Sequence, residues 1–146
     1  MGFAEQIKAF EQKAILKASL NTNNIVEELF SQVVILSPSP SNPGLFFKGL
    51  LANQWYSEVG SYSNSLSTTT NDSGLESLSR IKATLRTNPF LGKDNIITFT
   101  NNVNHAYRAE NLGWPQGEGA NGWYWSGKQA PYGMVNKSVL IIKAKY

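Results

Sequence analysis

The N-terminal stretch, residues 3–20, reads FAEQIKAFEQKAILKASL and predicts a helix. The apolar residues that recur there at spacings of three and four are Phe3, Ile7, Phe10, Ala14 and Ala18. This spacing places them on one helical face. Asn21 to Asn24 (NTNN) then interrupt with residues that favour caps and turns, and a second helical pattern follows from Ile25 to Val34. We expect one long helix with a weak point near Asn21.

The elements that follow this helix predict the fold class. Three prolines within residues 37–45 (SPSPSNPGL) end the helix. Residues 50–61 and 96–102 predict strands, and residues 75–87 predict a short helix. The tail, residues 131–146, is ambiguous, because Pro131 can open a helix while SVLII favours a strand.

We therefore expect an α+β fold, with a small, mostly antiparallel sheet and a long N-terminal helix. One or two further helices pack on this sheet, which we expect to hold more strands than the two identified. The length fits a single domain over residues 1–146, with long loops at about 62–74 and 113–131.

Charge and cysteine content exclude several classes of protein. Charged residues make up 16% of the chain against a usual quarter, and the net charge is +3. No basic stripe of the kind found in nucleic-acid binders occurs, so specific DNA binding is not expected. The chain has no cysteine, which excludes disulfides, thiolate nucleophiles and zinc–cysteine sites. No apolar run approaches the roughly 20 residues of a membrane span, so we expect a soluble chain with no membrane partner, made in a cytoplasm.

The only histidine, His105, lies in residues 100–114 (TNNVNHAYRAENLGW), with Arg108 and Glu110 close by. Acid–base catalysis needs groups that converge in a pocket, and a triad needs a positioned serine, but no G-x-S-x-G motif occurs. One histidine cannot form a two-histidine metal site. We expect no enzymatic activity, no catalytic residue, no metal and no cofactor. His105 or Arg108 instead satisfies polar groups where a strand ends and a short helix begins.

Two glycine- and aromatic-rich motifs lie in the second loop. Residues 117–122 (GEGANG) match G-x-G-x-x-G but lack the flanking strand and helix that a dinucleotide site needs, so we interpret them as a loop. Aromatic side chains are dense over residues 123–132, beside Lys128. They can stack on bases or sugars, anchor a protein interface, or cover the chain's own core.

Three phrases of the sequence, taken in order, are similar to those of a known protein family. The first is SPSPSNPG followed by ANQW, with Ser37, Pro38, Asn42, Pro43, Gly44, Asn53 and Trp55. The second is TNNVNHAYRAENLGW, with Asn101, Asn102, Ala106, Arg108, Glu110, Gly113 and Trp114. The third is GKQAPYGMV, residues 127–135. Together they resemble the neck or tail-completion proteins of tailed bacteriophages, over about two-thirds of the chain.

The sequence departs from the family pattern at three places. Asn42 stands where the family has an aspartate, and His105 stands where it has a tyrosine before alanine. Residues 115–125 (PQGEGANGWYW) look like an insertion between the second and third phrases.

The resemblance implies a structural virion protein, the head-to-tail joining protein of the phage neck, assembled in the host cytoplasm. It implies a homo-oligomeric ring of about six or twelve copies that contacts the portal or its adaptor and the tail tube or terminator, with DNA close by in the channel. A tail terminator of the same junction, and a nucleic-acid or glycan-binding module built on residues 123–132, remain alternatives. The interface and structural candidates are Trp55, Arg108, Glu110, Trp114, Trp123, Trp125, Lys128 and Tyr132.

Overall fold

The computed structural model describes residues 2–37, 50–67, 74–89, 96–104, 106–111 and 134–146, except for the side chains of Leu50, Arg108, Ala109 and Asn111. In chain order the elements are α1 (Phe3–Leu36), α2 (Leu50–Asn53), β1 (Trp55–Val59), α3 (Leu75–Thr87), β2 (Ile97–Asn101), α4 (Ala106–Asn111) and α5 (Met134–Lys145). The fold mixes helix and sheet, with a long N-terminal helix and further helices packed on an antiparallel sheet. This confirms the predicted fold class.

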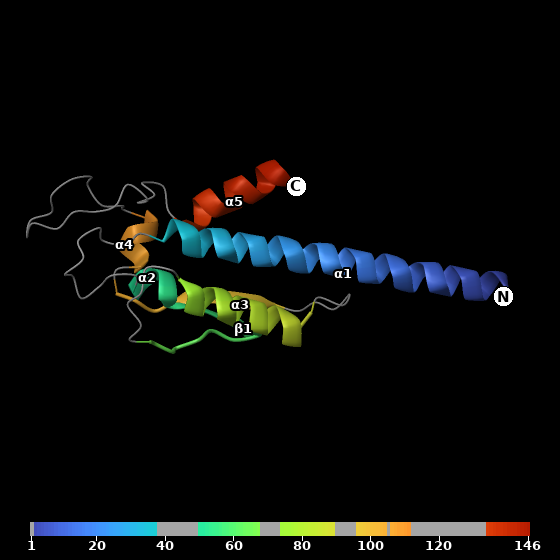
Figure 1. Ribbon diagram of the computed structural model, residues 1–146, viewed down its shortest axis with the longest axis horizontal. Coiled ribbons are helices and arrows are strands. Elements are labelled where there is room, and N and C mark those ends of the chain that lie inside the picture. The colour runs from blue at the N-terminus through green and yellow to red at the C-terminus, as the bar shows by residue number, and fades with distance from the viewer. Residues whose placement is uncertain (1, 38–49, 68–73, 90–95, 105, 112–133) are drawn as a thin grey trace, which may run out of the picture.

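The long helix α1 extends from the N-terminus at one end of the view to the neighbourhood of α4 and α2 (Figure 1). Helix α5 lies along one side of its C-terminal half and helix α3 along the other. The N-terminal part of α1 projects past the ends of both helices. No helix among the described ranges is long and apolar enough to cross a bilayer.

The predicted weak point near Asn21 does not interrupt α1, which is one helix from Phe3 to Leu36. Asn21, Thr22 and Asn24 are exposed, so their polar groups reach water without breaking the helix. The Thr22 hydroxyl also donates a hydrogen bond to the Ala18 carbonyl, 2.9 Å away, inside the helix.

The sheet pairs β1 with β2 in antiparallel register, with Trp55 opposite Asn101 and Val59 opposite Ile97. The strand predicted at residues 96–102 is confirmed, but the strand predicted at residues 50–61 is wrong over its first part, where Leu50–Asn53 form the helical turn α2. Within the described part of the chain the sheet has two strands, and the expected further strands do not occur there.

Every layer contributes to one core. Its buried side chains are Val33 and Val34 of α1, Leu51 and Ala52 of α2, Trp55 of β1, Ile81 and Leu85 of α3, and Met134 of α5. Helix α3 has the predicted bounds. Burial of each large apolar side chain stabilises the fold by about 1.5–3 kcal/mol, and this is the main force that holds the layers together.

The ambiguous tail folds as helix α5 and is fastened at its end to α1. The Lys145 ammonium lies 2.6 Å from the Glu28 carboxylate, and the Tyr146 hydroxyl donates to the same group at 2.9 Å. The hydrogen bond from Lys145, followed by that from Tyr146, lowers the pKa of Glu28 below its ordinary 4.5, and Glu28 raises the pKa of Lys145 above 10.5. These contacts hold α5 antiparallel to α1.

Candidate functional site

Glu110, near the end of α4, caps the N-terminus of α5. Its carboxylate accepts hydrogen bonds from the backbone N–H groups of Met134 at 2.6 Å, Val135 at 2.9 Å and Asn136 at 3.2 Å. The first N–H groups of a helix have no partner within the helix, and the helix dipole favours a negative charge there. Residue 133 is glycine and has no side chain with which to cap the helix. The distant Glu110 therefore takes the place of an N-cap residue.

Trp55, the first residue of β1, lies in the core with 5% of its surface exposed. Its indole N–H donates to the Ser37 hydroxyl at 2.8 Å, and its ring stacks on Phe99 of β2 at 4.8 Å between centroids. Phe99 stacks in turn on Phe30 of α1 at 4.2 Å. Of the roles expected for Trp55, a structural one fits this burial, because the ring joins both strands to α1.

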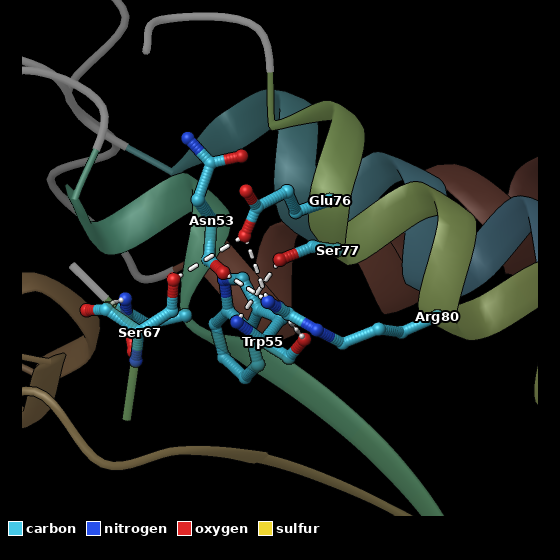
Figure 2. A network of polar contacts seen from close by, with 7 residues as sticks. Asn53, Trp55, Ser67, Glu76, Ser77 and Arg80 are labelled. Atoms are coloured by element: carbon cyan, nitrogen blue, oxygen red, sulfur yellow. Dashed lines mark hydrogen bonds and ion pairs between the residues drawn. The ribbon is translucent and has the colours of Figure 1, made fainter. Parts of the chain in front are cut away.

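A polar network centred on Arg80 of α3 fixes the start of β1 (Figure 2). The Arg80 guanidinium donates to the carbonyls of Asn53 at 2.7 Å and Trp55 at 3.2 Å, and to the Glu76 carboxylate at 2.9 Å. The Ser77 hydroxyl accepts the Trp55 backbone N–H at 3.0 Å. The planar guanidinium suits this task because it presents several donors in fixed directions.

The side-chain amides of Gln54 and Asn102 hold the described part of the 62–74 loop. The Gln54 side chain is fully buried; it accepts the Ser67 N–H at 2.7 Å and donates to the Ser67 carbonyl. The Asn102 amide donates to the carbonyls of Ser63 at 2.8 Å and Ser65 at 3.1 Å. Residues 63–67 are thus held to the sheet through their main chain.

The sequence did not predict the roles of Arg80, Gln54 and Asn102. Each binds main-chain groups of another element, and a single sequence carries no signal for such contacts.

A shallow, open concavity of about 340 Å³ lies beside the α4–α5 corner. Its lining is largely apolar and includes Trp55, Phe99, Ala106, Met134 and Val135. The acid in this lining is Glu110, which is already engaged by α5. Among the described residues no group of three or more His, Asp or Glu side chains could hold a metal ion.

The described residues of the three sequence phrases, which include Ser37, Trp55, Asn101, Glu110 and Met134, are connected near this corner. The first phrase closes on itself through the hydrogen bond from Trp55 to Ser37. The second joins the residues just before Trp55 through the Asn101 amide, which donates to the Leu51 carbonyl at 2.8 Å. The second also joins the third through Glu110 and Met134. Segments far apart in the sequence therefore form one hydrogen-bonded unit.

The remaining sequence candidates lie outside the described residues. Arg108 belongs to α4, but its side chain is not among those described, so the structural role expected for it stays a prediction. His105, Trp114, Trp123, Trp125, Lys128 and Tyr132 fall in the undescribed positions 105 and 112–133. The three interpretations of the aromatic loop therefore remain predictions as well.

Comparison with known proteins found no matching family model, no matching curated protein and no matching solved structure.

Proposed function

We propose that this chain is a structural protein of the bacteriophage neck, a ring subunit that joins the capsid portal or its adaptor to the tail. The observation that carries the proposal is the contact among the described residues of the three resembling phrases: Trp55 donates to Ser37 and lies opposite Asn101 in the sheet, and Glu110 caps the helix that begins at Met134. In a family pattern, residues that are spaced along the sequence are expected to contact one another in the fold, as these do. The convergence supports reading the three phrases as parts of one family pattern.

The use of the acidic side chains supports a structural role. Glu110 caps α5, Glu76 binds Arg80, and Glu28 binds Lys145. A general acid or base must instead face a substrate within hydrogen-bond reach. Glu110 and Glu28 each join two helices, and Glu76 orients Arg80 within α3, which fits a protein that acts by holding its shape.

Exposed apolar surface supports assembly with other proteins. Phe3 and Phe10 on the projecting part of α1 are 79% and 72% exposed, and Tyr107 beside the concavity is 71% exposed. Contiguous exposed apolar surface marks contact sites in soluble proteins. A neck subunit needs several such surfaces, because it touches its own copies as well as the proteins above and below it.

The test uses a tailed phage that encodes this chain. Deleting the reading frame should give DNA-filled heads and tails of normal length that stay unattached, as seen by electron microscopy of the lysate. The chain supplied from a plasmid should restore joined particles, and mass spectrometry should find it in purified virions. Joined, infectious particles without the chain would overturn the proposal, and so would its absence from virions. Tails of uncontrolled length would assign it to the terminator instead of the joining protein.

A further inference from the structure

We draw no further inference here: the strongest candidate, the apolar concavity at the α4–α5 corner that β2 also lines, carries no proposal because nothing in the described part of the structure shows what covers it.

Discussion

Replacement of Glu110 by alanine measures what the cap on α5 contributes to stability. The change removes the acceptor of three N–H groups and the negative charge beside the helix N-terminus. Loss of an N-cap costs about 0.5–2 kcal/mol, and loss of a partly buried charge at a helix end costs up to about 2 kcal/mol. We expect Glu110→Ala to lower the free energy of unfolding by about 2–3 kcal/mol.

The series Glu110→Ala, Glu110→Gln and Glu27→Gln separates the charge from the hydrogen bonds. Glutamine keeps one acceptor oxygen, so Glu110→Gln should lose about half as much stability as the alanine variant. Glu27 lies in a weak surface pair with Lys82, so Glu27→Gln should lose less than about 0.5 kcal/mol.

Thermal unfolding followed by circular dichroism provides the measurement. At roughly 3–5 °C for each kcal/mol in a chain of this size, Glu110→Ala should melt about 6–15 °C below the parent. Hydrogen exchange should show faster exchange confined at first to the start of α5. If Glu110→Ala melts within the range of Glu27→Gln, and the Met134 to Asn136 amides keep their protection, then Glu110 does not cap α5.

Three further changes test other contacts. Gly74→Ala should lower the free energy of unfolding in urea by more than about 2 kcal/mol, since its φ is +63° and an added Cβ would lie 2.4 Å from a side-chain carbon of α1. Gly60 has a φ of +72° but open space around it, so Gly60→Ala should cost only about 1 kcal/mol. Equal losses in the two variants would contradict this reasoning. Arg80→Lys should cost about 1–3 kcal/mol in the same assay, because one ammonium cannot serve both main-chain carbonyls and the carboxylate; unchanged stability would refute the role given to the guanidinium. The Glu28–Lys145 contact should weaken in acid: the folded pKa of Glu28 lies below its unfolded value of 4.5, so the stabilisation is present above that value and is lost as pH falls through the folded pKa. Because the pKa of Lys145 is raised above 10.5, the contact should persist in alkali until the pH exceeds 10.5. The measurement is hydrogen exchange at the end of α5, compared with Lys145→Met. If this exchange is the same at neutral and acid pH, the contact does not stabilise α5.

Local pattern was sufficient to predict the elements whose stability lies in their own residues. The apolar spacing from Phe3 onwards predicted α1, and that of residues 75–87 predicted α3 with its observed bounds. The β-branched run at residues 96–102 predicted β2. In α3 the apolar face that the sequence displays faces the core, as Ile81 does; in α1 the core residue Val33 belongs to the second pattern, whereas Phe3, Ile7 and Phe10 of the first are exposed.

The sequence could not predict the elements that other parts of the chain stabilise. Residues 50–53 looked like the start of a strand, but their helical turn is fixed by Arg80 of α3 and Asn101 of β2, which bind its carbonyls. The tail contains a run that favours strand, yet it forms α5, whose first turn is satisfied by Glu110 from 24 residues away. These stabilising residues are distant in the sequence, so the pattern within a short segment does not reveal them.

The candidate site, like the fold, was predicted only in part. Trp55 and Glu110 were singled out from the sequence, and both make contacts that join separate elements. The sequence did not show that Trp55 would be buried, because the aromatic stack with Phe99 brings together strands about 40 residues apart. The exposure of Phe3, Ile7 and Phe10 was also not foreseen, since an apolar helical face has the same sequence pattern whether it is covered or exposed.

The unbroken length of α1 makes it a stiff rod about 50 Å long, clamped at one end by Val33 and Val34. The polar residues 21–24 do not interrupt the helix, so a force or torque applied near Phe3 is transmitted along the helix axis to Val33 and Val34. The length of α1 also fixes the position of its N-terminal tip. Adding or removing one residue between Leu20 and Ile25 would change the reach by about 1.5 Å and swing the free tip by about 100°, so the number of residues in α1 sets where its tip points.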